Sequence, residues 1–363
     1  MMGRFRWGIF GTGAVSAKFV AGLAATRDVE ASFVASRSIE KARLFAAAMG
    51  VPRAIEGYAE AAAGHDVDAI YIATPPAEHV RHALMALEAG VPVLVEKPLA
   101  FAAEDAARIA EAARSRGLFA MEAMWTRFLP AARRLKDQTA SGAIGEIRMA
   151  TGSFGVSYVP APNSNLFDPM LGGGAIAHLG AYPLSIGQWL FGTPELKHAT
   201  GTIGATGVDE DAAVQLLYPG GVIGSFTASL RAWGPDDFDV MGTHGSIGLH
   251  GPIVRPYGLD VATRPPRMND ATQFDPKMRL RETGLFHQLL QRLDRPGRGG
   301  RTTRSVRYAG NGYQHQAEEV RDCMLRGDIE SRIMPLDDSI AVARSADAIR
   351  RAIGASQGSN VPN

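Results

Sequence analysis

The sequence predicts an α/β protein of two domains: a doubly wound parallel sheet, then an α+β domain with a mostly antiparallel open sheet. The chain has 363 residues, whereas a single domain usually holds about 100–200. Up to about residue 124, short apolar runs alternate with helical patterns, which is typical of a parallel sheet covered on both faces. Beyond that point strand patterns follow one another with few helices between them. We therefore predict domains at residues 1–124 and 125–363.

In the first domain, each predicted strand is a near-continuous apolar run, and a helical pattern follows most of them. The predicted strands are Trp7–Phe10, Ala31–Ala35, Ala69–Ala73, Val93–Val95 and Phe119–Ala123. The predicted helices are Ser16–Ala25, Ile39–Met49, Ala77–Ala89 and Ala103–Arg116. Right-handed crossovers make such a sheet doubly wound, and its ligand then lies at the carboxyl ends of the strands.

In the second domain, alternating patterns predict five strands, two of which form a hairpin around the Pro-Gly-Gly turn at 219–221. The predicted strands are Glu146–Val156, His198–Ile203, Ala212–Tyr218, Val222–Leu230 and Phe238–Thr243. The predicted helices are Ala175–Leu190, Gln314–Arg326 and Asp338–Ile353, the last a candidate to pack back on the first domain. Residues 251–300 are rich in Arg, Pro and Gly, and we assign them no element.

Composition excludes several classes of partner. The net charge is +1, which gives no electrostatic reason to expect nucleic acid or a membrane surface. No run approaches the roughly 18 apolar residues of a membrane span. The N-terminus runs directly into a strand pattern, so we expect no signal peptide. The single cysteine, Cys323, cannot form an internal disulfide, which fits a reducing compartment. We therefore expect a cytoplasmic protein that binds a small molecule.

The turn after the first strand has the pattern of a dinucleotide site. It reads Gly11-Thr12-Gly13-Ala14-Val15-Ser16 and opens the first helix. The first glycine permits a tight turn, the second lets a pyrophosphate approach the backbone, and Ser16 keeps helix and strand close. Free N–H groups and the helix dipole attract phosphate. The alternative is a glycine turn without a ligand. The glycine motif lies at the head of a βαβ series, and this position favours a Rossmann nucleotide-binding domain over the alternative.

The end of the second strand predicts the choice of cofactor. NAD enzymes usually carry Asp or Glu there to bind the ribose 2′-hydroxyl. This chain has Ser36, Arg37 and Ser38, with Lys41 one helical turn later. Arg presents a bidentate fork to phosphate oxygens, so these groups suit the 2′-phosphate of NADP. The alternative is that Arg37 is only a solvated loop residue.

Several motifs together carry a resemblance to a known family. They are Ala73-Thr74-Pro75-Pro76 with His79, Glu96-Lys97-Pro98, Gly172-Gly173-Gly174-Ala175, the run Met121–Phe128, Asn311-Gly312-Tyr313 and Met334–Asp338. With them the chain resembles the Gfo/Idh/MocA oxidoreductases, which are named after glucose–fructose oxidoreductase and inositol dehydrogenase. The run Met121–Phe128 resembles the branch that contains dimeric dihydrodiol dehydrogenase. The resemblance covers nearly the whole chain apart from about 255–305.

The resemblance implies the roles of the motif residues. Lys97 is expected at the nicotinamide, where an ammonium can polarise a carbonyl oxygen and stabilise an alkoxide. The Lys97–Pro98 bond is typically cis in this family. The match also implies that His79 borders the nicotinamide and that Thr74, Pro75, Pro76 and Glu96 belong to the cofactor site. Family substrates are sugars, polyols and cyclic diols, and the open face of the second sheet commonly forms a dimer, so we expect a homodimer or higher homo-oligomer.

Two residues on the helix after the glycines are candidates for proton transfer. His178 and Tyr182 lie four residues apart and share a helix face. Relatives carry an acidic residue at the His178 position, whereas Tyr182 fits the dihydrodiol branch as proton donor or acceptor. A phenol has a pKa near 10, so we expect Lys97 to lower it. His178 is either an acid/base itself, with an ordinary pKa near 6.5, or a residue that shapes the substrate site.

Three other features receive simpler interpretations. Trp125 and Phe154 are candidates for the apolar wall of the substrate pocket. His79 and His82 form an H-x-x-H pair without further metal ligands nearby in sequence, so we expect no metal. Arginines recur at every third position from Arg292 to Arg307, which we interpret as a solvated loop leading into an edge strand rather than a nucleic-acid surface.

The sequence therefore predicts an NADP(H)-dependent oxidoreductase in which Lys97 and Tyr182, with His178 as an alternative, handle the proton. Two other functions stay open. One is a nucleotide-sensing regulatory protein of the same fold, against which an intact Glu96-Lys97-Pro98 motif argues. The other is a redox-neutral enzyme that keeps its nicotinamide tightly bound.

Overall fold

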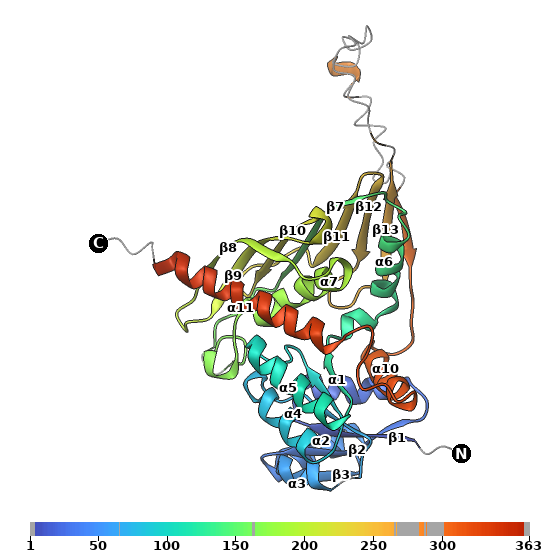
Figure 1. The fold of residues 1–363 in the computed structure, drawn as a ribbon, viewed down its shortest axis with the longest axis vertical. Helices are drawn as coiled ribbons and strands as arrows, with labels where there is room; N and C mark the ends of the chain where they lie inside the picture. The colour runs from blue at the N-terminus through green and yellow to red at the C-terminus, as the bar shows by residue number, and fades with distance from the viewer. Residues whose placement is uncertain are drawn as a thin grey trace.

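The N-terminal half of the fold is a parallel sheet covered by helices on both faces (Figure 1). The computed structural model describes residues 4–64, 66–161, 164–264, 266, 283–286, 288 and 301–358. The sheet has the order β3-β2-β1-β4-β5-β6, and every pair is parallel. Its strands are β1 (Phe5–Phe10), β2 (Val29–Ser36), β3 (Arg53–Glu56), β4 (Ala69–Ile72), β5 (Val93–Glu96) and β6 (Ala120–Ala123). The doubly wound topology is confirmed, and strand order reverses at β1 and β4, where a ligand crevice is expected.

The helices of this half are α1 (Ala14–Leu23), α2 (Ile39–Met49), α3 (Tyr58–Ala63), α4 (His79–Glu88) and α5 (Ala103–Arg116). The prediction missed β3 and α3. The reason is physical: β3 is an edge strand whose residues are only partly buried, so it lacks the continuous apolar run of the central strands. The omission matters because α3 brings Tyr58 to the ligand pocket.

The second sheet has eight strands in the order β14-β13-β12-β11-β7-β10-β9-β8. They are β7 (Ile147–Gly155), β8 (Glu195–Ile203), β9 (Asp209–Leu217), β10 (Ile223–Ser229), β11 (Asp237–Gly242), β12 (Gly245–His250), β13 (Gly258–Thr263) and β14 (Arg301–Ser305). Only β7 and β10 pair in parallel, so the predicted mostly antiparallel sheet is confirmed. The hairpin is also confirmed, because β9 and β10 pair antiparallel from Leu217 and Ile223 outward. Gly220 and Gly221 in its turn take φ of 77° and 80°.

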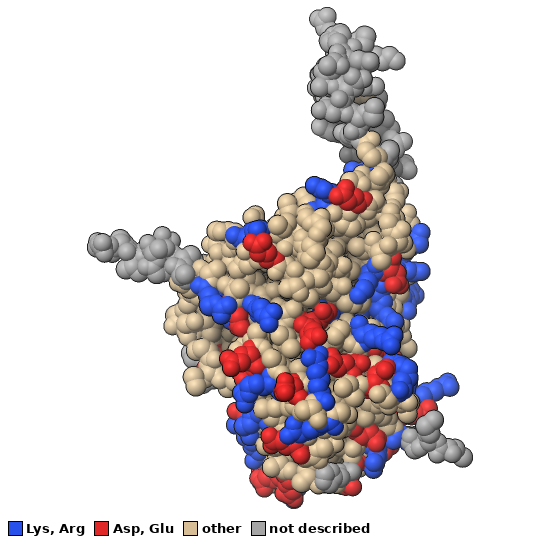
Figure 2. All heavy atoms as spheres, in the orientation of Figure 1, with Lys and Arg blue, Asp and Glu red and all other residues tan. Residues whose placement is uncertain are grey.

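The predicted edge strand after the arginine-rich stretch is β14, which pairs with β13 at the end of the sheet. Arg301 and Arg304 belong to it, whereas Arg292, Arg295 and Arg298 lie outside the described residues. On the face in view, basic and acidic side chains intermingle over the parallel-sheet half rather than forming a patch of one sign (Figure 2). No helix within the described residues combines the length and apolar character that a membrane span requires.

The helices of the second half are α6 (Pro130–Ala140), α7 (Ala181–Phe191), α10 (Gln314–Leu325) and α11 (Leu336–Gly358). Of these, α10 and α11 contact the first half. Helix α11 contacts α5, α7 and β8, and its Asp347 accepts the N–H of Ala103 at the start of α5 at 2.9 Å. Helix α10 contacts α1, and the side chain of Asn311 donates to the carbonyl of Lys18 at 2.7 Å. The C-terminal segments therefore pack back on the first half of the chain, as expected for the last helix.

Candidate active site

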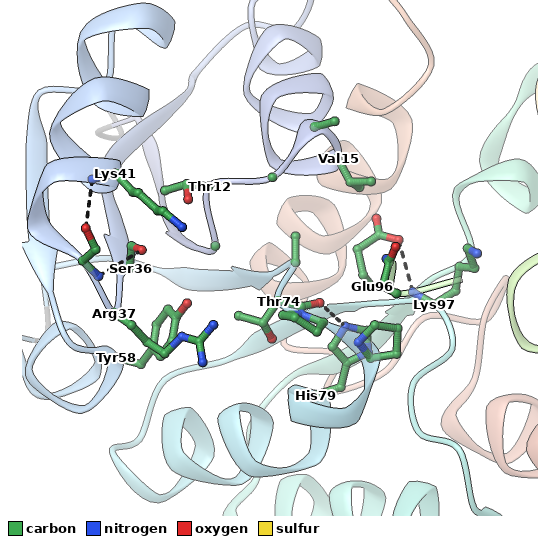
Figure 3. A pocket seen from close by; sticks show the side chains of 18 of the residues that line it. Thr12, Val15, Ser36, Arg37, Lys41, Tyr58, Thr74, His79, Glu96 and Lys97 are labelled. Carbon is green, nitrogen blue, oxygen red and sulfur yellow. Dashed lines mark hydrogen bonds between the residues drawn. The ribbon is translucent and has the colours of Figure 1, made fainter. Parts of the chain in front are cut away.

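A pocket lies at the carboxyl ends of β1, β2, β4 and β5 (Figure 3). It contains every residue that the sequence analysis assigned to the nucleotide. These are Gly11, Thr12, Gly13, Ala14, Val15, Ser36, Arg37, Ser38, Lys41, Thr74, Pro75, Pro76, His79, Glu96 and Lys97. Four further residues, Tyr58, Ala73, Asn165 and His178, complete the lining. The ends of four strands thus contribute their residues to a single crevice.

The glycine turn leaves room for a diphosphate. Gly11 has a φ of 105°, and a Cβ there would lie 2.6 Å from the carbonyl oxygen of Ala73, so only glycine fits. A Cβ on Gly13 would meet no protein atom within 4 Å, so the space above it is open. Gly13 caps α1 without a side-chain hydrogen bond, which leaves the first N–H groups of that helix free. These features fit a pyrophosphate at the helix N-terminus.

Cationic and hydroxyl groups lie where β2 ends. Arg37 is exposed, makes no ion pair with any described residue, and extends into the pocket beside Tyr58, while Lys41 points in from the opposite side (Figure 3). Ser38 is used locally, since its hydroxyl accepts the N–H of Lys41 at 3.3 Å and caps α2. Ser36 is buried on the pocket wall, and its hydroxyl accepts the N–H of Ser38 at 3.3 Å. The side chains available to bind a phosphate here are therefore those of Arg37 and Lys41.

His79 connects the loops after β4 and β5. Its Nδ1 lies 2.8 Å from the carbonyl oxygen of Pro98, and its Nε2 lies 2.9 Å from that of Thr74. Burial lowers the pKa of His79 to about 4, so the ring is neutral at pH 7 and only one of the two nitrogens donates. His82 contacts the Thr74 hydroxyl at 2.9 Å instead. Among the residues with assigned positions, no group of His, Cys, Asp and Glu could hold a metal ion.

Glu96 is a buried carboxyl at the floor of the pocket. It accepts a hydrogen bond from the hydroxyl of Tyr71 and a second, at 3.2 Å, from the N–H of Lys97. Burial raises the pKa of Glu96 to about 7, against the opposing effects of the Tyr71 hydrogen bond and the Lys97 charge. The carboxyl thus fixes the backbone of Lys97 and changes charge close to neutral pH.

Lys97 is held by a main-chain carbonyl of the opposite domain. The expected cis Lys97–Pro98 bond is present. Its ammonium donates to the carbonyl oxygen of His178 at 2.8 Å. That oxygen lies in a π-helical turn, Ile176–Gly180, and Pro183 five residues later has no N–H to offer it. The predicted helix Ala175–Leu190 is therefore not uniform, and its irregular first turn provides an acceptor for Lys97.

Tyr182 lies among aromatic side chains beside Lys97. The Lys97 ammonium lies over the phenol ring, 5.1 Å from its centroid. The hydroxyl accepts from the indole N–H of Trp125 at 3.4 Å, and the Phe154 ring packs edge-on at 5.5 Å. Burial raises the pKa of Tyr182. The expectation that Lys97 lowers this pKa was wrong, because the ammonium lies over the ring rather than at the oxygen and the effect of burial dominates.

His178 is a neutral, hydrogen-bonded side chain. Its Nε2 lies 3.1 Å from the carbonyl oxygen of Gly172. Burial, helped by the positive charge of Lys97, lowers its pKa to about 3. An imidazole with this pKa does not change protonation between pH 5 and 8, which weakens the alternative in which His178 is the acid/base. Its carbonyl oxygen and its ring both border the Lys97 end of the pocket.

Comparisons with known proteins agree with this geometry. Residues 5–124 match the oxidoreductase family with an NAD-binding Rossmann fold, and residues 132–248 match the Gfo/Idh/MocA C-terminal domain. A trans-1,2-dihydrobenzene-1,2-diol dehydrogenase from Bos taurus is 34% identical over 353 residues, which cover 96% of this chain and 97% of the relative. The chain belongs to the Gfo/Idh/MocA oxidoreductase family. The resemblance to its dihydrodiol dehydrogenase branch is thereby confirmed.

A second relative is the enzyme of the same name from Oryctolagus cuniculus, 35% identical over 88% of this chain and 89% of its own. Two solved structures share the fold. The 3-ketoreductase KijD10 from Actinomadura kijaniata, in complex with NADP and TDP-benzene, has a TM-score of 0.78 at 24% identity and covers 96% of this chain and 98% of its own. Levoglucosan dehydrogenase, in complex with NADH and levoglucosan, has a TM-score of 0.78 at 21% identity and covers 97% of both chains.

The sequence analysis missed several residues of this site. Tyr58 belongs to the unpredicted helix α3. Tyr313 stacks on Trp125, with ring centroids 4.5 Å apart, and Arg255 lies 5.3 Å from the Trp125 ring centroid. Tyr313 follows the Asn311-Gly312 pair already noted, so its position was a usable signal. Arg255 lies in a segment to which no element was assigned, and nothing local marks it.

Proposed function

We propose that this protein is an NADP(H)-dependent oxidoreductase that interconverts a secondary alcohol and a carbonyl on a sugar, polyol or cyclic diol. The observation that carries the proposal is the contact between Lys97, a half-buried lining residue of the nucleotide pocket, and the buried Tyr182 behind it, whose ring centroid lies 5.1 Å from the ammonium. Lys97 donates a hydrogen bond to the His178 carbonyl, and the Tyr182 hydroxyl accepts one from Trp125. Relatives named as diol dehydrogenases, and neighbours of the same fold named as a ketoreductase and a levoglucosan dehydrogenase, support this range of substrates.

Bound nicotinamide would supply the hydride chemistry, since this is the cofactor's own contribution. The protein supplies charge and a proton. The Lys97 ammonium polarises the substrate carbonyl and stabilises negative charge on its oxygen. Because burial raises the pKa of Tyr182, its phenol stays protonated at neutral pH and donates to that oxygen in the direction of reduction. In the oxidative direction the alcohol gives its proton to the deprotonated Tyr182 oxygen, so the phenol must first lose its own proton.

We propose NADP rather than NAD as the cofactor. The neighbouring structures do not decide this, since one holds NADP and another NADH. The proposal rests instead on this chain's own residues: β2 ends without a carboxylate, and Arg37 and Lys41 extend into the pocket without acidic partners among the described residues (Figure 3). A carboxylate would repel the 2′-phosphate, whereas a guanidinium binds it in a bidentate manner.

Replacing Arg37 by glutamine should weaken NADP binding about 10- to 100-fold, because a charge-assisted bidentate contact is lost. NAD binding should be nearly unchanged, and titration of both cofactors by fluorescence measures this. Arg43→Gln, an exposed change on the helix α2 that follows Arg37, is the control and should alter neither affinity. Equal weakening of both cofactors in Arg37→Gln would contradict the assignment of the 2′-phosphate site.

A screen of polyols, sugars and cyclic diols with NADP and NAD in parallel tests the proposal as a whole. We expect reduced nicotinamide to form with at least one diol, faster with NADP. The two alternative functions give different results. Cofactor that survives gel filtration, with turnover but no net change in reduced-nicotinamide absorbance, would indicate a redox-neutral enzyme. No turnover with any diol, together with a protein partner released by NADP, would indicate a regulatory sensor.

We further propose that the open face of the eight-stranded sheet forms a homodimer or higher homo-oligomer. Met149 on β7 and Ile223 on β10 are register partners and are 41% and 47% exposed. Adjacent exposed apolar residues at the centre of a sheet favour burial against another surface. Light scattering should give at least twice the chain mass of 38.6 kDa, and Ile223→Lys should shift the protein towards monomer.

We also propose a cytoplasmic location. The single cysteine, Cys323, is buried and free, which fits a reducing compartment.

A further inference from the structure

Glu122 lies behind the loop that carries Lys97. It belongs to β6, is 3% exposed, and is the register partner of Val95, so it lies beside the end of β5 from which the loop begins. Its Oε1 accepts the N–H of Leu99 at 3.0 Å. Because Pro98 has no N–H, Leu99 supplies the first N–H after Lys97. Glu122 therefore binds the backbone only two residues beyond Lys97.

A second buried carboxyl holds the backbone on the other side of Lys97. Glu96 accepts the N–H of Lys97 itself at 3.2 Å. The carbonyl between these two bonds faces His79, whose neutral ring donates to it in only one of its two tautomers. The two carboxyls accept from backbone N–H groups, so their bonds do not depend on a tautomer. Glu96 and Glu122 therefore fix the chain immediately before and after the Lys97 side chain.

A small cavity lies on the inner side of this loop. It has a volume of about 20 Å³ and lies between the loop and the π-helical turn whose His178 carbonyl accepts from the Lys97 ammonium. Its lining includes Pro98–Phe101 of the loop, Ile176 and Ala177 of the turn, and the side chains of Glu122 and Ser339. Protein interiors are normally close-packed, and packing is incomplete at this point. The bond from Leu99 to Glu122 therefore supplies a constraint on the loop that side-chain packing does not.

Glu122 has two properties that act near Lys97, an acceptor oxygen and a charge. Burial lowers the pKa of Lys97, and the charges of Glu96 and Glu122 raise it. Burial raises the pKa of Glu122, which disfavours its charged form, and the nearby Ser339 hydroxyl lowers it. Even so, neither Oε2 of Glu122 nor the Ser339 hydroxyl has a hydrogen bond of good geometry to any described residue. The oxygen that accepts from Leu99 is therefore the part of Glu122 that is bonded directly to the loop.

We propose that Glu122 is a positioning residue of the active site, which through the N–H of Leu99 fixes the loop that directs the Lys97 ammonium at the substrate oxygen. The inference rests on the proposed function for the role of Lys97. It adds to that site a residue that does not line the nucleotide pocket. The acceptor oxygen of Glu122, rather than its charge, is what the reaction requires, since a shift of a catalytic group by about 1 Å can cost about 100-fold in rate.

Two conservative variants separate the acceptor from the charge. Glu122→Gln keeps an oxygen at the same reach and removes the charge, whereas Glu122→Asp keeps the charge and withdraws the oxygen by one methylene. With NADP and trans-1,2-dihydrobenzene-1,2-diol, kcat should stay close to the wild-type value in Glu122→Gln and fall about 10- to 100-fold in Glu122→Asp. KM and the affinity for NADP should be nearly unchanged in both. Ser339→Ala, which alters the opposite wall of the cavity, is the control and should keep the wild-type kcat.

Hydrogen exchange of the peptide that contains Leu99 reports on the loop without turnover. The Leu99 N–H should exchange faster in Glu122→Asp and at the wild-type rate in Glu122→Gln. A wild-type kcat in Glu122→Asp would overturn the inference and leave the proposed function intact. An equal loss of kcat in both variants would also overturn it, because the charge would then be the property that matters. Faster exchange in Glu122→Asp alone, with no nicotinamide reduction by the wild-type protein, would support the hold of Glu122 on the loop and contradict the proposed function.

Discussion

Replacing Lys97 by methionine is expected to lower kcat by about 10²–10⁴-fold, while the affinity for NADP changes little. Electrostatic stabilisation and proton transfer are each typically worth about this much. Lys97 is the one ammonium in the nucleotide pocket next to Tyr182, and its bond to the His178 carbonyl holds it there. Methionine keeps the length and apolar stem of the side chain, so the buried space stays filled.

For Lys97→Met, steady-state kinetics measure kcat, and a cofactor titration on the same samples measures the affinity for NADP. Lys136→Met is the matched control, because Lys136 is also partly buried against an aromatic ring, 4.6 Å from the centroid of Trp189, but lies outside the pocket. Its kcat should equal that of the wild type. An unchanged kcat in Lys97→Met would contradict the proposed mechanism. If NADP affinity falls as much as kcat does, Lys97 acts in cofactor binding instead.

Replacing Tyr182 by phenylalanine is expected to lower kcat about 10²-fold or more, because the ring and its packing stay while the transferable proton is lost. Tyr218→Phe is the control. Tyr218 is likewise buried, and its hydroxyl has no hydrogen-bond partner among the residues with assigned positions, so removing that hydroxyl should leave kcat unchanged. His178→Asn should chiefly raise KM, since it changes the shape of the site rather than the proton donor.

The pH profile of kcat/KM separates the two candidates for the proton. Burial raises the pKa of Tyr182 and lowers that of His178 to about 3. The phenol therefore keeps its proton through neutral pH, and the imidazole stays neutral above about pH 4, so neither residue should produce an ionisation near 6.5. A profile with a histidine-like ionisation near 6.5 that vanishes in His178→Asn, together with full kcat in Tyr182→Phe, would exchange the roles. An ionisation near 7 that persists in both variants would instead fit Glu96, whose pKa burial raises to about 7.

Patterns that depend on local geometry were predictable from the sequence. The glycine turn could be predicted because Gly11 takes a φ of 105°, which residues with a side chain rarely adopt, and because Gly13 places no side chain in the space expected for the pyrophosphate. The central strands were evident because burial on both faces requires continuous apolar runs. The edge strand β3 and helix α3 were missed because partial exposure removes that requirement, and Tyr58 was missed with them.

The sequence by itself determined the two sheets, the nucleotide turn, the lack of a carboxylate after β2 and the identity of Lys97 and Tyr182 as candidates. Only the tertiary structure decided how these groups act on one another. It placed the Lys97 ammonium over the Tyr182 ring rather than at its oxygen and gave it a hydrogen bond to the His178 carbonyl in an irregular helical turn. It also brought Arg255 to Trp125 across 130 positions of chain. The physical reason is that pKa values and hydrogen-bond partners depend on burial and on through-space distance, and both arise from packing between segments far apart in the chain.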